Sequence, residues 1–239
     1  MDAPGRFEAS GAEELETVLG YRFQDPGLLR LALVQRTYSH ENPTDAPDDN
    51  ERLEFLGDAV FALTVAQALH DWPIRLPEGE MTRIRATLVC ERMQAEIARE
   101  IGLGAHLLLG RGEESTGGRE KSTNLCNALE ALVGSVFLDG GWQAAERSVL
   151  ALYGPRIGQA VAERRTIDAK SRLIEAAQSL VPQRAVTFRI TREEGPVHER
   201  LFTAEALVDG EVAGSGAGPS KKEAERMAAV AALASLGLS

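Results

Sequence analysis

The feature that most constrains this chain is a run of acids inside an otherwise apolar helical segment, residues 50–58 (Asn-Glu-Arg-Leu-Glu-Phe-Leu-Gly-Asp). At about 100° per residue, Glu51, Glu54 and Asp58 fall within roughly 60° of one another around a helix. Like charges held that close repel each other and destabilise the fold. A solvated acidic stripe would tolerate them, but the interleaved leucines and phenylalanine are too dense for a freely exposed helix. A divalent cation bound by these oxygens would remove the repulsion.

The composition allows two modest domains with a substantial core. The chain has 239 residues, 44% of them hydrophobic, and a formal net charge of −10 that falls mostly in residues 1–167. The remainder is nearly neutral and can still carry a local basic patch. The two cysteines, Cys90 and Cys126, match no disulfide framework or zinc site, so we expect free thiols in a cytoplasmic protein. The polar, acidic start and the shortness of the longest apolar run predict no secretory signal and no membrane partner.

Two regions differ in their hydrophobic periodicity. Residues 1–160 have helical spacing throughout and predict an all-helical domain. The expected helices cover residues 13–19, 26–36, 51–69, 78–101, 124–139 and 142–154, with loops at 42–50 and 110–123. Asp25 and Pro26 are a typical helix start. The polar residues 161–167 are expected to form a linker, with a helix tail as the alternative.

Residues 168–239 predict a smaller α-β-β-β-α domain, so the fold class is multidomain, all-α followed by α+β. The expected elements are a helix at 169–180, strands at 186–191, 200–208 and 212–217, and a helix at 220–236. Asp209-Gly210 predicts a hairpin turn between the last two strands. Ser220 with Glu223 predicts a capping box at the start of the last helix.

A second helix brings another acid into an apolar face. Glu130 and Asn127 form an i, i+3 pair in residues 127–134 (Asn-Ala-Leu-Glu-Ala-Leu-Val-Gly). A lone buried glutamate is commonly paired by an arginine, but acids on two apolar helices favour a shared metal site. Oxygen donors without a Cys or His cluster favour Mg²⁺ or Mn²⁺ over zinc. Such an ion suits phosphoryl chemistry, because it activates water and offsets charge on the leaving oxygen.

The C-terminal region carries a separate signal for phosphate binding. Lys221 and Lys222 lie at the start of the last helix, where the helix dipole and backbone N–H groups also attract anions. A solvated helix start is the alternative. The preceding glycines and the α-β-β-β-α order favour a nucleic-acid contact.

These motifs together resemble bacterial ribonuclease III, an endonuclease domain followed by a double-stranded RNA-binding domain, over essentially the whole chain. The resemblance is carried by residues 50–58, 77–80 with 83–88, 127–134 with 136–139, Gly195-Pro196 with His198, and 216–225. It implies a Mg²⁺-dependent hydrolase, with Mn²⁺ as a plausible substitute and no small-molecule cofactor. It further implies a homodimer that cuts double-stranded RNA, leaves staggered ends with 5′-phosphate and 3′-hydroxyl, and processes ribosomal and other RNAs.

The resemblance also implies roles for individual residues. Glu54, Asp58 and Glu130 would be metal ligands, with Asp58 and Glu130 indispensable to hydrolysis. Glu51 and Glu78 would be supporting acids, and Phe55 would insert into a hydrophobic socket on the partner subunit. The residues implied in RNA binding are His198, Ser220, Lys221 and Lys222.

One position departs from the family pattern. Asn127 stands where the family normally has an aspartate, so a fourth ligand would keep an oxygen but lose its charge. We hypothesise weaker metal affinity, with a higher Mg²⁺ requirement or a shift towards Mn²⁺. The alternative function is a double-stranded RNA-binding protein whose nuclease centre is impaired by Asn127. A metal phosphoesterase acting on small nucleotides is disfavoured, because it would leave the C-terminal domain unused.

Overall fold

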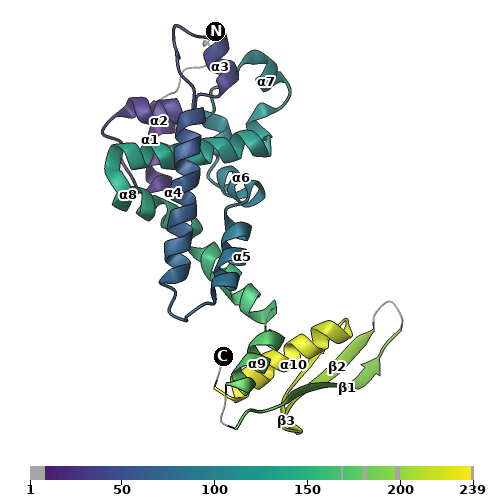
Figure 1. The fold of residues 1–239 in the computed structure, drawn as a ribbon. Helices are drawn as coiled ribbons and strands as arrows, with labels where there is room; N and C mark the ends of the chain where they lie inside the picture. The colour runs from purple at the N-terminus through teal and green to yellow at the C-terminus, as the bar shows by residue number, and fades with distance from the viewer. Residues whose placement is uncertain (1–8, 168, 180–181, 197–199, 238–239) are drawn as a thin grey trace. The chain divides into compact units, whose positions relative to one another are not determined.

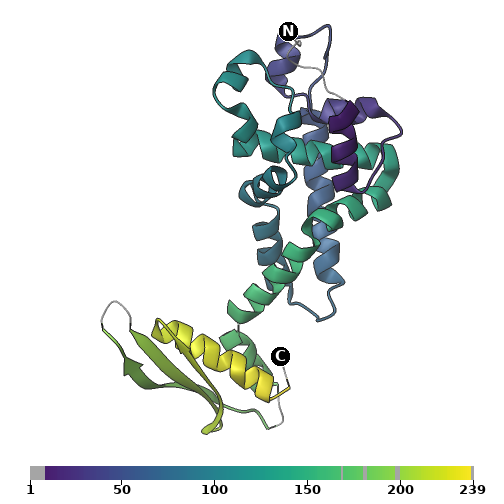
Figure 2. The ribbon, with the colours of Figure 1, turned by 180° about the vertical axis from the view of Figure 1, so that it is seen from behind.

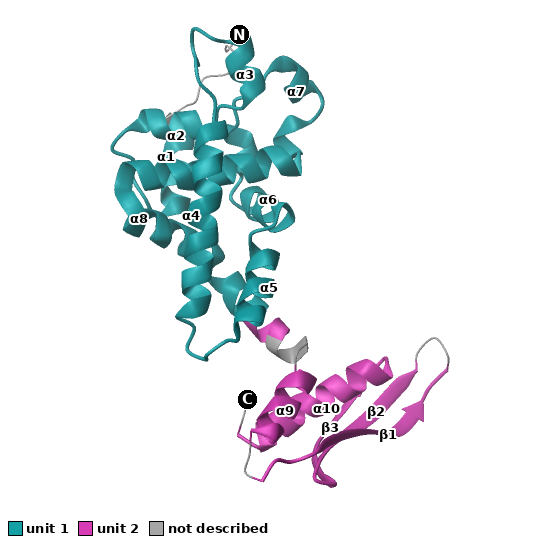
Figure 3. Cartoon of the chain, in the orientation of Figure 1, with its two compact units in different colours: residues 1–160 teal, residues 161–239 magenta. Residues whose placement is uncertain are grey.

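The computed structural model describes residues 9–167, 169–179, 182–196 and 200–237. They divide into two compact units, residues 1–160 and residues 161–239 (Figure 3). The helices that begin in the first unit are α1 (Ala9–Leu19), α2 (Pro26–Ala32), α3 (Arg36–Glu41), α4 (Glu51–His70), α5 (Glu78–Leu88), α6 (Glu91–Glu100), α7 (Arg111–Ser115) and α8 (Ser122–Ile167), with 3₁₀ turns η1 (Leu103–His106) and η2 (Gly118–Glu120). The second unit contains α9 (Ala169–Gln178), β1 (Val186–Glu194), β2 (Leu201–Val208), β3 (Glu211–Gly218) and α10 (Lys221–Ser235). The expected fold class is confirmed.

Helices α4 and α8 cross in the core of the first unit (Figures 1 and 2). A Cβ added at Gly57 would lie 1.8 Å from the Glu130 backbone oxygen, and one at Gly134 would lie 2.3 Å from the Leu53 oxygen. Only glycine permits so close an approach of two backbones. By length and composition alone α4 could also span a membrane, but Phe61, Val65 and other side chains along it are buried in the protein.

Two expected helices are interrupted in the structure. Residues 26–36 do not form one helix, because the segment between α2 and α3 pairs with Leu108: Leu108 N donates to Leu33 O at 2.9 Å, and Gln35 N donates to Leu108 O at 3.0 Å. Residues 78–101 form α5 and α6, which are separated at Cys90, whose backbone is extended (φ −80°, ψ 151°). Cysteine has no strong helix preference that would resist this break.

The segments expected as a loop and as a linker contain helical structure. Residues 110–123 include α7, η2 and the start of α8 rather than a continuous loop. Residues 161–167 are helical and continue α8, as their Ala, Glu and Arg content permits. Within α8, Gly141 interrupts the helix with φ 74°, near the gap expected at 140–141.

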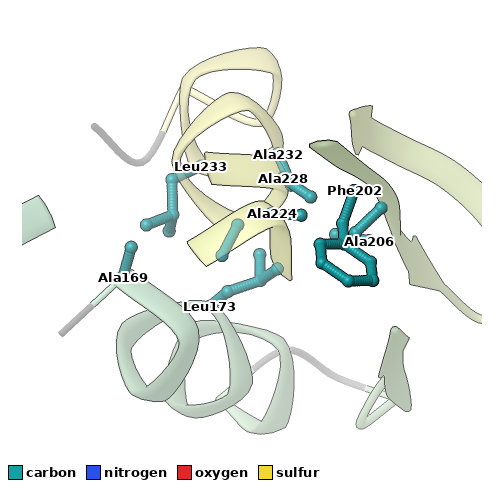
Figure 4. Packing of buried hydrophobic residues seen from close by; sticks show 10 residues of the cluster. Ala169, Leu173, Phe202, Ala206, Ala224, Ala228, Ala232 and Leu233 are labelled. Atoms are coloured by element: carbon teal, nitrogen blue, oxygen red, sulfur yellow. The ribbon is translucent and has the colours of Figure 1, made fainter. Parts of the chain in front are cut away.

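The second unit is a three-stranded antiparallel sheet, in the order β1-β2-β3, with helices packed on it. The expected hairpin turn has positive φ at both Asp209 (52°) and Gly210 (85°), as a type I′ turn requires. Alanines of β2 and α10 fill much of the core around Leu173 of α9 (Figure 4). A Cβ at Gly216 would lie 2.3 Å from Ala228 N, so α10 rests almost directly on β3.

Candidate metal centre and RNA-binding surface

The α4–α8 crossing brings the acids of the two helices together. Gly57 lies between Glu54 and Asp58 on α4, and its Cα faces the Glu130 backbone of α8. Glu130 is buried, with 8% of its surface exposed, whereas Glu54 is half-buried and Asp58 is exposed. The candidate centre therefore runs from a buried carboxylate outward to solvent.

The carboxylates repel one another in this arrangement. Burial raises the pKa of Glu130 to about 7, and the charges of Asp58 and Glu54 add to the rise, while the Gln94 amide opposes it. Burial also raises the pKa of Glu54, and the nearby Glu51 and Asp58 contribute in the same direction. Within the described part of the chain, no Lys or Arg forms an ion pair with Glu54, Asp58 or Glu130. Among the described residues, Glu130 thus lacks the arginine partner that the purely structural interpretation expects.

The donor chemistry of this cluster fits a hard divalent cation. Its donors are carboxylate oxygens, with the Asn127 amide one helical turn before Glu130, and their mutual repulsion calls for positive charge. Across the described residues, no three His, Cys, Asp or Glu side chains converge as a ready-made metal cage. The acids are neighbours, so a bound cation would have to draw them together.

The two supporting acids make other contacts. Glu51 accepts from Arg36 Nη1 at 3.2 Å, an exposed ion pair at the start of α4. Glu78 is exposed on α5 and accepts from Thr82 Oγ1 at 2.8 Å. The structure thus places Glu51 beside Glu54 and does not bring Glu78 into contact with the α4 acids.

Phe55 lies on the outer side of α4. With 81% of its surface exposed, it is the most exposed of the large hydrophobic side chains described. Leu63 and Leu138 are also more than half exposed, at 55% each. Contiguous exposed apolar surface marks interaction sites, whereas single exposed apolar side chains are common on any protein.

The candidate RNA contacts lie at the start of α10. Ser220 is the N-cap, and its hydroxyl accepts from Glu223 N at 3.2 Å. The reciprocal half of the capping box is absent, because the Glu223 carboxylate pairs with Arg226. Lys221 and Lys222 are exposed, and neither forms an ion pair with a described acid. His198 lies outside the described residues.

Two polar residues have roles that the sequence did not reveal. Arg119 donates through Nη1 to the carbonyl oxygens of Gly104, Ala105 and Leu107 at 2.9–3.0 Å. These hydrogen bonds link η2, which contains Arg119, to η1 and to the residue that follows it. Gln94 of α6 is completely buried beside Cys126, near Glu130. A polar residue on the apolar face of a short helix was the only signal that the sequence offered.

Comparison with known proteins gives one answer for both units. The family model described as Ribonuclease-III-like matches residues 25–157, and that described as Double-stranded RNA binding motif matches residues 169–236. Ribonuclease 3 of Syntrophobacter fumaroxidans is 42% identical over 229 residues, 94% of each chain. Ribonuclease 3 of Oleidesulfovibrio alaskensis is 45% identical over 221 residues, 92% of this chain and 96% of that one.

A solved structure extends the likeness to three dimensions. The nuclease domain of ribonuclease III from Campylobacter jejuni, described for structural flexibility in a region involved in dimer formation, is 38% identical with a TM-score of 0.55. The match covers 60% of this chain and 96% of that one. The present chain belongs to the ribonuclease III family of nucleases and carries that family's helical nuclease domain followed by a double-stranded RNA-binding motif.

Proposed function

We propose that this protein is an endoribonuclease that hydrolyses phosphodiester bonds of double-stranded RNA with Mg²⁺, leaving 5′-phosphate and 3′-hydroxyl staggered ends. The observation that carries the proposal is the glycine-tight crossing of α4 and α8, which gathers Glu54, Asp58 and Glu130 without a cationic partner in the described chain. The family membership of the chain supports it. The alternative of a binding protein with an impaired centre is not favoured, because the named relatives are nucleases.

Each acid has a distinct part in this proposal. Bound Mg²⁺ would supply an activated water and offset charge on the leaving oxygen. Glu54, Asp58 and Glu130 would hold the ion, with Asn127 as a neutral fourth ligand, and exposed Asp58 would face the RNA backbone. Glu51 would support Glu54 from the start of α4, and Glu78 on α5 would be a second supporting acid.

Cleavage of a synthetic RNA duplex tests the activity directly. We expect staggered products in Mg²⁺, binding without cleavage in Ca²⁺, and a loss of at least about 100-fold in rate for Asp58→Asn and Glu130→Gln. Asp71→Asn is the matched control, because Asp71 is an exposed acid at the end of the same helix whose carboxylate interacts with His70. Full cleavage by Glu130→Gln would refute the assignment.

Asn127 should set the metal requirement of the enzyme. Restoring a charged ligand with Asn127→Asp should lower the Mg²⁺ concentration that gives half-maximal cleavage, because the site regains a full negative charge. Superimposable Mg²⁺ curves for the two proteins would show that position 127 does not contact the ion.

The C-terminal domain would grip the duplex by its shape. Lys221 and Lys222 at the α10 N-terminus would contact phosphates across a groove, with Ser220 beside them, and the family resemblance adds His198 to this set. Substituting both lysines by alanine should weaken duplex binding and reduce the salt dependence of log K by about 0.7–0.9 per lost phosphate contact. An unchanged slope would remove the lysines from the interface.

We further propose a homodimer that joins through the exposed Phe55 and acts on ribosomal and other RNAs. The exposure of Phe55 supports the dimer. The free thiols of Cys90 and Cys126 support a reducing, cytoplasmic setting.

A further inference from the structure

Gln94 is a buried amide with one half of its hydrogen-bonding capacity unused. None of its surface is exposed, and among the described residues its Nε2 has no acceptor at hydrogen-bond geometry. A buried N–H donor without an acceptor is unfavourable, so such a group in a folded domain calls for an explanation. Apolar residues would fill the same space on α6 without this penalty.

The surroundings of Gln94 relate it to the candidate metal centre. The Cys126 thiol donates to Gln94 Oε1 at 2.6 Å, and the same sulfur lies 3.9 Å from Glu130 Oε1. The two oxygens therefore flank one sulfur. In this orientation the thiol donates to the amide oxygen, and Nε2 remains a donor without an acceptor among the described residues. The Gln94 amide also favours the ionised form of Glu130.

We propose that Gln94 is a positioning residue for Glu130: its Nε2 donates to the Glu130 carboxylate when that carboxylate turns to bind a divalent cation, and Cys126 holds the amide in the orientation that allows it. The inference rests on the proposed metal centre. Carboxylate ligands of metals are themselves held by hydrogen bonds from a surrounding layer of residues, and removing such a partner typically weakens metal binding by about 10- to 100-fold.

The test measures Mn²⁺ binding to the full-length protein by electron paramagnetic resonance of the free ion. Gln94→Met keeps a side chain of similar length and removes both amide groups. We expect it to weaken Mn²⁺ binding by about 10-fold or more. Its thermal midpoint in EDTA should stay the same or rise, because a buried unpaired donor is gone.

Ser148→Ala is the matched control. The Ser148 hydroxyl is likewise buried on α8 without a hydrogen-bond partner in the described part of the chain, and it is not among the groups that shift the Glu130 pKa. Its removal should leave Mn²⁺ binding unchanged.

The outcomes separate this inference from the metal centre itself. Mn²⁺ binding that is lost in Glu130→Gln but kept within about twofold in Gln94→Met would overturn the role of Gln94 and leave the centre standing. A fall of several degrees in the EDTA midpoint of Gln94→Met would assign it a purely structural role and also overturn the proposal. A wild-type protein whose Mn²⁺ binding does not depend on Glu130 would overturn both.

Discussion

Replacing Gly57 by alanine should damage both the stability of the nuclease domain and the proposed metal centre. The added Cβ would lie 1.8 Å from the Glu130 backbone oxygen, where ordinary contact begins at 3.4 Å. Helices α4 and α8 would have to separate by about 1.5 Å to accommodate it. The obstacle is backbone rather than the end of a flexible side chain, so no rotamer change relieves it.

The expected destabilisation follows from two opposing contributions. Overpacking a core costs about 1–3 kcal/mol and sometimes more. Alanine recovers about 1 kcal/mol of that through its better helix propensity. Because the clash is with rigid backbone, we expect the overpacking cost to lie at the top of that range or above, about 3 kcal/mol or more, so that the net loss is about 2 kcal/mol or more. For a domain of this size that lowers the thermal midpoint by roughly 4–8 °C. A shift of about 1 Å between Glu130 and the α4 acids would lower the rate by about 100-fold.

The assay is thermal unfolding in EDTA, followed by duplex cleavage at a temperature where the variant is folded. Gly158→Ala is the matched control, because Gly158 also lies within α8 but a Cβ there would lie 3.7 Å from Trp72, at ordinary van der Waals contact. It should stabilise the protein by up to about 1 kcal/mol. A Gly57→Ala protein that melts at or above the wild-type temperature would refute the tight crossing. A destabilised variant with full activity per folded molecule would refute the link between crossing and site.

Three further predictions concern single side chains. The folded state raises the pKa of Glu130 from its ordinary 4.5 to about 7, so below pH 4.5 both folded and unfolded states hold the proton and this group does not destabilise the fold. As pH rises towards 7, the free energy of unfolding of the metal-free protein should fall by up to about 3 kcal/mol. Urea unfolding in EDTA should show a smaller fall for Glu130→Gln. Phe55→Ala should shift sedimentation from dimer towards monomer with little change in the unfolding of the monomer, because Phe55 is 81% exposed; an unchanged dimer would contradict this. Arg119→Ala should lower the thermal midpoint by several degrees without changing the salt dependence of RNA binding, because its three carbonyl contacts are internal.

Local chemistry made part of this structure predictable. The spacing of Glu51, Glu54 and Asp58 fixes their shared face once α4 is a helix, whatever packs against it. Asp25 caps α2 through a 2.8 Å hydrogen bond from Gly27 N, and Asp209 adopts the positive φ that its turn requires. Each of these depends on residues within a few positions of one another.

Features set by distant partners were not predictable in this way. The break between α2 and α3 exists because Leu33 and Gln35 hydrogen-bond with Leu108, far along the sequence. The carbonyls that Arg119 binds and the thiol that contacts Gln94 likewise become neighbours only in the folded domain. A sequence pattern can show that a residue is unusual for its position. Its role, however, depends on contacts with residues that are distant in the sequence.

The acids of the proposed metal centre and the glycines at the α4–α8 crossing depend on each other. Left to electrostatics, Glu130 would move away from Asp58 and Glu54, since each of them raises its pKa. The helices prevent this, because their backbones touch at Gly57 and Gly134. The side chains that pack α4 and α8 into the core on either side of this contact are buried. The packing of the two helices thus holds the like charges close together. A cation that binds between them would not have to supply the free energy that overcomes their repulsion. A substitution that relaxes the crossing should therefore weaken metal binding even when it leaves every acid in place.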